Sequence, residues 1–167
     1  MASYDFGKDE MVKWVKKTLP KGSTCLDVGA CDGKWYDLLG DYLEMDAVEA
    51  FWPNILKHRL YEKYGKVYGE DAAYIEYDWY DLIIFGDVLE HMTVGKAQKT
   101  LAYAYPRCKE IIIGIPFLFT QGEIYGNPWE RHIQDDLTPE LFNERYKGFE
   151  MYIRPVWEYA YYIKERK

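Results

Sequence analysis

The stretch Leu26-Asp27-Val28-Gly29-Ala30-Cys31-Asp32-Gly33 decides how this sequence folds. Apolar residues lead into it, so residues 23–30 are predicted to form a buried strand that closes in a glycine-containing turn. Gly29 and Gly33 let the backbone turn sharply and approach a ligand closely. A helix is predicted directly afterwards, at residues 33–43. In an open α/β sheet, ligands bind beyond the end of such a strand.

The rest of the chain continues this alternation of strands and helices. Further helices are predicted at 5–19, 52–65, 94–105 and 138–146, and further strands at 44–51, 66–72, 80–88 and 109–117. Residues 148–156 and 157–165 have strand-like patterns joined by a tight link, which predicts an antiparallel hairpin. The order predicts an α/β fold whose mostly parallel sheet ends in an antiparallel strand. Without a linker or repeat, residues 1–167 are expected to form one domain, in which residues 1–20 contain the N-terminal helix.

One segment, residues 118–136, has no hydrophobic period. Long excursions of this kind in compact domains usually serve function. Trp129, Arg131 and His132 lie in it and suggest a cover over a substrate. The alternative is an ordinary surface loop.

Composition limits the classes of partner. The net charge of −7 disfavours binding to a nucleic-acid backbone or to a membrane surface. Three cysteines without a CxxC pair argue against a disulfide scaffold and against a structural zinc site. The first residues lack the apolar core of a signal peptide, and no apolar stretch is long enough to span a membrane. The expected location is therefore the cytoplasm.

Charge and spacing at the first strand favour one kind of ligand. Glu49 ends the second predicted strand and is placed to accept hydrogen bonds from ribose hydroxyls, although a solvated strand-end carboxylate is the alternative. The glycines have the spacing G-x-x-x-G instead of the G-x-G-x-x-G that holds a pyrophosphate. Asp27 and Asp32 suit a sulfonium or ammonium better than a phosphate. Asp27 can instead accept hydrogen bonds from the loop backbone.

The motif D-x-G-x-C-x-G at Asp27–Gly33 resembles motif I of the class I S-adenosylmethionine-dependent methyltransferases, with Cys31 where the usual D/E-x-G-x-G-x-G has a glycine. The segments VEAF, GEDA, DLIIFGDVLEHM and GNPWERH with LTPELF extend the resemblance over nearly the whole chain, toward the small-molecule branch that includes ubiquinone-biosynthesis-type O-methyltransferases. This resemblance implies a Rossmann-like three-layer sandwich with a seven-stranded sheet of order 3-2-1-4-5-7-6.

The resemblance also implies S-adenosylmethionine as cofactor and S-adenosylhomocysteine as product. The residues implied to contact the methionine part are Asp27, Gly29, Ala30, Cys31 and Gly33. The residues implied to contact the nucleoside are Glu49 at the ribose, and Ala50, Phe51, Asp71 and Ala72 at the adenine. Gly86, Asp87 and Val88 would flank the sulfonium. Ala50, Phe51 and Val88 fit equally well as simple core residues.

The reaction implied is direct displacement at the sulfonium methyl, for which the protein aligns a nucleophile. His91 and His132 are the candidates for a base that activates a hydroxyl acceptor. If the segment after the fourth strand starts a helix, Asp87 and His91 share a face, although a histidine beside Glu90 is often just hydrogen-bonded in place. Asp87-x-x-Glu90-His91 resembles a Glu-x-x-Glu-His pattern linked to a divalent ion in ubiquinone-type enzymes. Because its first position differs, no metal is expected.

A small molecule is the expected acceptor. The sequence has no D/N-P-P-Y/F motif and no Pro-Cys pair of the base-modifying enzymes, and it is too short for the added domain of a protein-arginine enzyme. It also lacks extra N-terminal lid helices, so the acceptor pocket is either open or completed by a partner subunit in a homo-oligomer. Two other classes stay open: a non-catalytic S-adenosylmethionine-binding module and, less favoured by the glycine spacing, a nicotinamide-dependent oxidoreductase.

Overall fold

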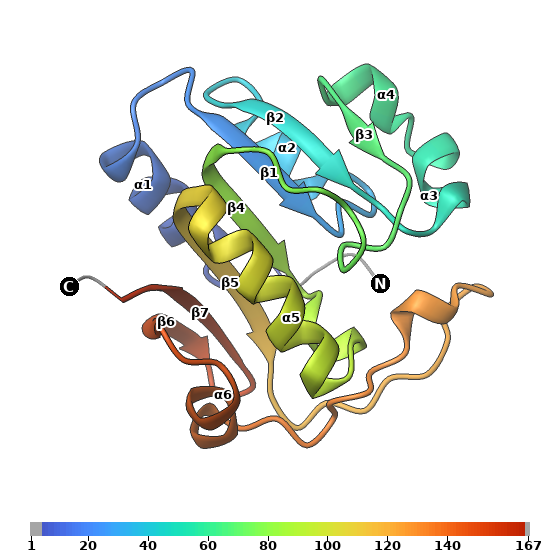
Figure 1. Ribbon diagram of the computed structural model, residues 1–167, viewed down its shortest axis with the longest axis vertical. Helices are drawn as coiled ribbons and strands as arrows, with labels where there is room; N and C mark the ends of the chain where they lie inside the picture. Colours follow the sequence, from blue (N-terminus) through green and yellow to red (C-terminus); the bar gives the residue numbers. More distant parts are fainter. Residues whose placement is uncertain (1–4, 166–167) are drawn as a thin grey trace.

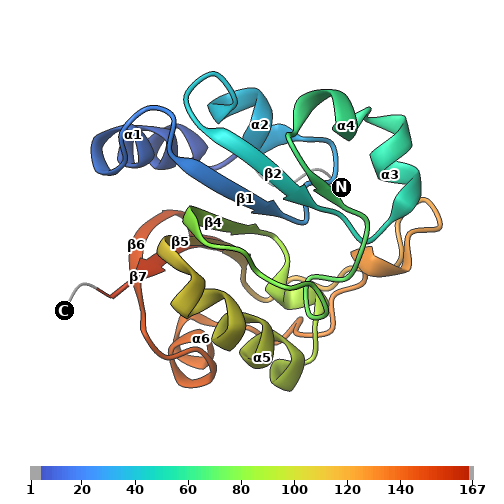
Figure 2. The same ribbon diagram turned by 45° about the horizontal axis from the view of Figure 1, so that its top comes forward.

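A computed structural model of the chain describes residues 5–165, which form a three-layer α/β sandwich (Figures 1 and 2). The middle layer is a seven-stranded sheet of order β3-β2-β1-β4-β5-β7-β6. Its strands are β1 Thr24–Val28, β2 Glu44–Val48, β3 Val67–Tyr68, β4 Tyr80–Gly86, β5 Cys108–Pro116, β6 Phe149–Val156 and β7 Tyr159–Lys164. Strands β1 to β5 pair in parallel, whereas β7 is antiparallel to both β5 and β6. The predicted fold class and strand order are therefore confirmed.

Helices cover both faces of the sheet. The bounds of the helices are α1 Lys8–Thr18, α2 Lys34–Leu39, α3 Trp52–Lys57, α4 Leu60–Lys63, α5 Val94–Ala104 and α6 Pro139–Arg145. Figure 2 shows α1 and α2 on one side of the sheet and α5 and α6 on the other. Alternate residues of β1 and β4 point to the two layers: Leu26 and Ile83 join the cluster with α5, and Cys25 and Leu82 join the cluster with α1. Strands β1 and β4 are thus buried on both faces.

Several elements are shorter than the sequence pattern predicted. The helix after β1 ends at Leu39 and β2 ends at Val48, where the predictions reached residues 43 and 51. The third strand stops at Tyr68, because Asp71 turns the chain out of the sheet by accepting a hydrogen bond from the Ala73 N–H at 3.0 Å. The second predicted helix is two helices, α3 and α4, separated by Arg59 at φ 53°. Ile55 and Leu60 are both fully buried. Residues five apart face different directions on one continuous helix, so the break lets both reach the core.

The strand register places three chain turns at one edge of the sheet. Val28, the last residue of β1, pairs with Val48 of β2 and with Phe85 of β4. The residues that follow these three strands therefore emerge together at the carboxyl edge. The excursion 118–136 leaves β5 at the same edge (Figure 1). Within residues 5–165, no helix is long and apolar enough to cross a membrane.

Candidate active site

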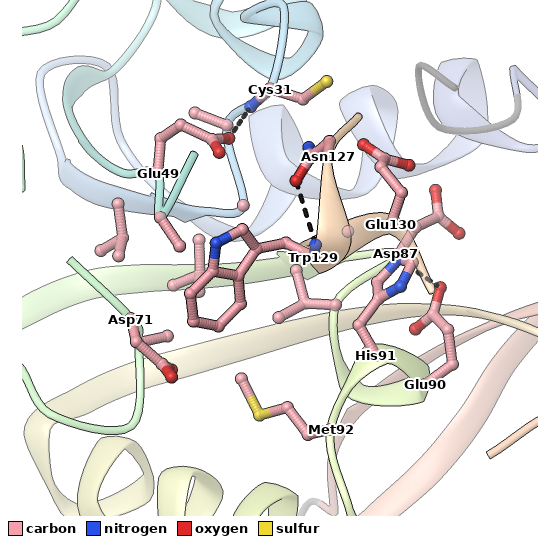
Figure 3. Close-up of a pocket in the computed structure, with 18 of the residues that line it drawn as sticks. Cys31, Glu49, Asp71, Asp87, Glu90, His91, Met92, Asn127, Trp129 and Glu130 are labelled. Atoms are coloured by element: carbon pink, nitrogen blue, oxygen red, sulfur yellow. Dashed lines mark hydrogen bonds and ion pairs between the residues drawn. The ribbon is translucent and has the colours of Figure 1, made fainter. Parts of the chain in front are cut away.

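A cavity opens at this carboxyl edge, between the ends of β1, β2 and β4 and the excursion (Figure 3). Its empty space, counted out to the open mouth, is about 1100 Å³. Ten of the thirteen residues predicted to contact a cofactor line it, together with both predicted catalytic histidines. The ten are Gly29, Ala30, Cys31, Glu49, Ala50, Asp71, Ala72, Gly86, Asp87 and Val88.

Two residues of the turn after β1, Gly29 and Cys31, have left-handed backbone conformations, and at Gly29 there is no space for a side chain. Gly29 has φ 75°, and a Cβ built there would lie 2.6 Å from Cγ2 of Val88. A side chain at this position would therefore force β1 and β4 apart. Cys31 also has a positive φ, 49°. This left-handed conformation explains why a glycine is usual at this position in the family that the motif resembles.

Glu49 holds the turn in shape. Its Oε2 accepts a hydrogen bond from the Cys31 N–H at 2.8 Å, and its Oε1 accepts one from the Phe51 N–H at 2.8 Å. The side chain is buried, and burial raises its pKa while the two N–H donors oppose the rise. Each carboxylate oxygen has a second lone pair. Glu49 can thus order the turn and still accept a hydrogen bond from a hydroxyl in the cavity.

Three of the predicted cofactor residues do not line the cavity: Asp27, Gly33 and Phe51. Asp27 is buried, and its Oδ2 accepts a hydrogen bond from the Tyr64 hydroxyl at 2.6 Å. The structure therefore places Asp27 in the protein interior, where its partner is a side chain and not the loop backbone. Gly33 has φ 83° and caps the start of α2. Phe51 stands just before α3 as its N-cap residue.

On the Asp71 side, three segments close the cavity. Asp71 forms an ion pair with Lys96 of α5. The Lys96 ammonium lies 5.3 Å from the centre of the Trp129 ring and 5.7 Å from that of Tyr74. Figure 3 shows the Trp129 ring reaching into the cavity from the excursion. The excursion therefore lines this side of the cavity, and its role as a cover over a substrate stays a prediction.

The segment after β4 differs from the predicted helix start. Asp87 has φ 56°, and Leu89–His91 form one 3₁₀ turn instead of an α-helix. Glu90, which is 1% exposed, has its carboxyl group close to both predicted bases. Its Oε1 lies 3.8 Å from Nε2 of His91 and 4.0 Å from Nε2 of His132. Asp87 and His91 therefore do not share a helix face, contrary to the prediction. The carboxyl group that faces His91 is that of Glu90.

The two predicted catalytic histidines, far apart in sequence, lie together. The ring centres of His91 and His132 are 4.7 Å apart in an edge-on arrangement. Burial lowers the pKa of His91 to about 4, helped by the neighbouring His132 ring. Burial also lowers the pKa of His132. Both rings are therefore neutral at physiological pH, the form in which a ring nitrogen has a free lone pair.

Gln134 holds the second half of the excursion against the segment that contains His91. Its amide Nε2 donates to the carbonyls of Leu89 and Met92 at 2.8 and 3.0 Å, and its Oε1 accepts from the Tyr146 hydroxyl at 2.8 Å. The backbone N–H of Gln134 also donates to the Glu90 carbonyl at 3.0 Å. These bonds tie the second half of the excursion to the 3₁₀ turn, and so they fix His132 beside His91.

The cavity is strongly acidic. Seven carboxylate side chains and two lysines line it. The acidic residues are Asp32, Glu49, Glu70, Asp71, Asp87, Glu90 and Glu130, and the basic ones are Lys34 and Lys96. Lys96 is already paired with Asp71, and Lys34 with Asp5. A cationic ligand therefore matches this cavity, and a pyrophosphate does not.

Sequence reasoning missed several lining residues, above all Trp35, Lys96 and Glu130. Trp35 and Lys96 stand in the first turns of α2 and α5, the helices that follow β1 and β4. First helical turns after parallel strands lie at the ligand edge, so this position was the available signal. Glu130 lies in the excursion, whose path the sequence pattern does not define.

At the level of sequence, no protein-family model and no curated protein matches the chain. At the level of structure, several methyltransferases do. An S-adenosylmethionine-dependent methyltransferase from Clostridium acetobutylicum superposes with a TM-score of 0.73 at 12% identity, over 97% of this chain and 92% of its own. The 1,6-didemethyltoxoflavin-N1-methyltransferase of Burkholderia thailandensis, solved with its substrate and S-adenosylhomocysteine bound, gives 0.63 at 17% identity, over 93% and 75%.

A candidate O-methyltransferase from Nostoc punctiforme gives a TM-score of 0.68 at 14% identity, over 93% of this chain. This chain spans 54% of the length of that larger protein. These likenesses define the class: the chain has the fold of the S-adenosylmethionine-dependent methyltransferases. The resemblance carried by the motif at Asp27–Gly33 is confirmed at the level of the fold.

Proposed function

We propose that this protein is an S-adenosylmethionine-dependent methyltransferase that acts on a small-molecule hydroxyl or amine. The observation that carries the proposal is the acidic cavity at the end of β1, with seven lining carboxylates beside a glycine turn. S-adenosylmethionine bears a sulfonium and an ammonium against one carboxylate, so its net charge complements such a cavity. The bound S-adenosylhomocysteine of the Burkholderia thailandensis neighbour supports the same ligand class.

The lining residues fit the cofactor part by part. Gly29, Ala30 and Cys31 line the cavity at the turn, and the methionine chain would lie against them. Glu49 would accept the ribose hydroxyls through its remaining lone pairs. Asp71 and Ala72 would border the adenine, and Asp87 would lie beside the positive sulfur. Gly33, Phe51 and Asp27 would then support this site from outside the cavity.

The acceptor would enter on the side of His91 and His132, under the excursion. The cofactor supplies an activated methyl group: the acceptor atom bonds to the methyl carbon while the carbon–sulfur bond breaks with its electron pair on sulfur, and the acceptor proton is released. The protein aligns the acceptor and excludes water. The neutral imidazoles near Glu90 are the groups placed to receive that proton.

A small acceptor and a cytoplasmic location belong to the same proposal. The cavity is bounded by Trp129 and the excursion, which favours a small acceptor over a macromolecule. Among residues 5–165, all three cysteines are unpaired thiols, which fits a reducing compartment.

Calorimetric titration tests the proposal. We expect S-adenosylmethionine and S-adenosylhomocysteine to bind and NADH not to bind. Replacing Glu49→Ala should weaken cofactor binding by about 10- to 100-fold, the range for losing hydrogen bonds to a charged group. The matched control is Glu44→Ala, an exposed glutamate at the start of β2, the strand that Glu49 follows. Equal weakening in both variants, or tight NADH binding, would contradict the assignment.

A second measurement separates an enzyme from a module that only binds the cofactor. Small phenols, amines and hydroxy acids are screened as acceptors of a labelled methyl group. Transfer to at least one of them is expected, and His91→Ala and His132→Ala should each lose transfer while keeping cofactor affinity. Cofactor binding without transfer to any acceptor class would favour the binding module.

A further inference from the structure

Three side chains that commonly bind metals converge where β4 meets the excursion. They are Glu90 and His91 of the 3₁₀ turn, and His132 of the excursion. One ligand atom from each lies within 4.8 Å of the other two. The hydrogen bonds of Gln134 to the carbonyls of Leu89 and Met92 hold the excursion against the 3₁₀ turn, and so they keep the three side chains together. The convergence is therefore built into the packing of two separate segments.

Hydrogen bonds fix which nitrogen of each imidazole is free. The Nδ1 of His91 bonds to the Arg131 carbonyl at 3.1 Å, and the Nδ1 of His132 bonds to the Phe119 carbonyl at 2.6 Å. A carbonyl can only accept, so each Nδ1 carries the hydrogen. The Nε2 atoms are then bare, and both face Oε1 of Glu90. Histidines that bind metals are held by backbone carbonyls in this same way.

Glu90 supplies the second, independent observation. Its side chain is buried, and no hydrogen bond from the described residues reaches either of its carboxylate oxygens. Three atoms with lone pairs thus face one another, and no hydrogen bond joins them. Burial and the nearby Asp87 raise the pKa of Glu90, so a cation that binds there displaces a proton from this carboxyl group. Burying such a carboxylate without a partner is costly. One water molecule can donate to only two of the three atoms, whereas a cation can bind all of them.

We propose that Glu90, His91 and His132 bind a divalent transition-metal ion such as Zn²⁺ or Fe²⁺. Ligand bonds of about 2.0–2.2 Å in tetrahedral geometry bring the ligand atoms to roughly 3.3–3.6 Å from one another. The observed 3.8 and 4.0 Å need a contraction of a few tenths of an ångström. Two imidazoles favour Zn²⁺ and Fe²⁺ over Mg²⁺, which prefers oxygen ligands. Asp87 is not part of this ligand group.

Three protein ligands leave a coordination position open toward the cavity, the arrangement of catalytic metal sites. Its use rests on the proposed function. A hydroxyl acceptor bound there would lose its proton to solvent more easily and be held for attack on the methyl carbon. His91 and His132 would then serve as ligands and not as bases.

The test is metal binding by the untagged protein after treatment with a chelator. Calorimetry with Zn²⁺ is expected to give one ion per chain, and Mg²⁺ is expected to bind at least about 100-fold more weakly. His132→Ala and Glu90→Gln should each reduce Zn²⁺ affinity by at least about 100-fold. The matched control is His58→Ala, because His58 is the remaining histidine of the chain and lies at the end of α3.

Circular-dichroism melting checks that each variant is folded. If Glu90→Gln does not fold, His132→Ala carries the test, because its side chain comes from the excursion and not from the core of the sheet. Absence of Zn²⁺ binding, or equal affinity in His132→Ala and His58→Ala, would overturn the site. Titration of the same metal-free samples with S-adenosylhomocysteine keeps the two proposals apart, since cofactor binding without metal binding rejects the metal site alone.

Discussion

Gly29 packs the turn after β1 against Val88, which follows β4. Its positive φ, and the 2.6 Å that would separate an added Cβ from Val88, leave no room for a side chain. Glu49 then ties the neighbouring Cys31 to the end of β2. Three strands are thus joined by one small residue and one carboxylate. This is the residue-scale reason why the cavity forms at this edge.

Asp27, which lies in β1 just before this turn, leads to a prediction about how stability depends on pH. Burial raises its pKa to about 7, while the Tyr64 hydroxyl and the Lys8 ammonium oppose the rise. In the unfolded chain the pKa is about 3.9. Between about pH 4 and pH 7 the native state therefore keeps a proton that the unfolded state has lost, and stability falls as pH rises through this range.

Replacing Asp27→Asn removes this titration, and Tyr64 can still donate to the amide oxygen. We expect the variant to lose less stability than the parent between pH 5 and pH 8. The difference should be at least about 1.4 kcal/mol, the equivalent of one pKa unit. Urea unfolding at both pH values measures it. The exposed Asp41→Asn serves as control, and a slope in Asp27→Asn as steep as that of the control would contradict the role given to burial.

At the scale of elements, the excursion 118–136, here called the strap, is held to the rest of the fold mainly through its second half. Its second half is held by Gln134, whereas Tyr125 near its tip is 97% exposed. Replacing Gln134→Leu would leave the carbonyls of Leu89 and Met92 and the Tyr146 hydroxyl without their partner. Each such buried group costs about 1–3 kcal/mol. The strap should therefore open more often.

Limited proteolysis with chymotrypsin measures this opening. Cleavage after Phe119, whose carbonyl is bonded to His132 in the closed form, is expected to be at least about tenfold faster in Gln134→Leu than in the parent, because cleavage follows the population of the open form. The matched control is Gln98→Leu, an exposed glutamine on α5. Unchanged cleavage would mean that the strap is held by contacts other than those of Gln134.

The same scale explains what the sequence could and could not predict. The alternation of strands and helices is a local feature and predicted the fold class, whereas the strand order was implied only by the family resemblance of the motif at Asp27–Gly33. The break at Arg59 was missed, since a left-handed arginine has no local signature and depends on burying Ile55 and Leu60 together. The cavity residues adjoining strand ends were predictable. Trp129 was predicted only to belong to a cover over the substrate. Its position in the cavity could not be predicted, because tertiary contacts set the path of a segment that has no hydrophobic period.

At the scale of the whole molecule, the cavity spans two separately built parts. Strands β1 to β3 supply the turn and Glu49, whereas β4 and the excursion supply the group around Glu90. A ligand that touches both parts binds the native state and not the unfolded chain. Its binding energy therefore adds to the stability of the whole fold.

This coupling predicts a rise in melting temperature with the proposed cofactor. At 100 times its dissociation constant, S-adenosylhomocysteine should add about 2.7 kcal/mol to the stability. For a domain of this size that is about 5–10 °C. Differential scanning calorimetry measures the shift, and NADH at the same concentration should give none. At that same ligand concentration Glu49→Ala should show a smaller shift than Glu44→Ala. A full shift in Glu49→Ala would mean that the ligand stabilises the fold without reaching the end of β2, and the ribose position assigned to Glu49 would be wrong.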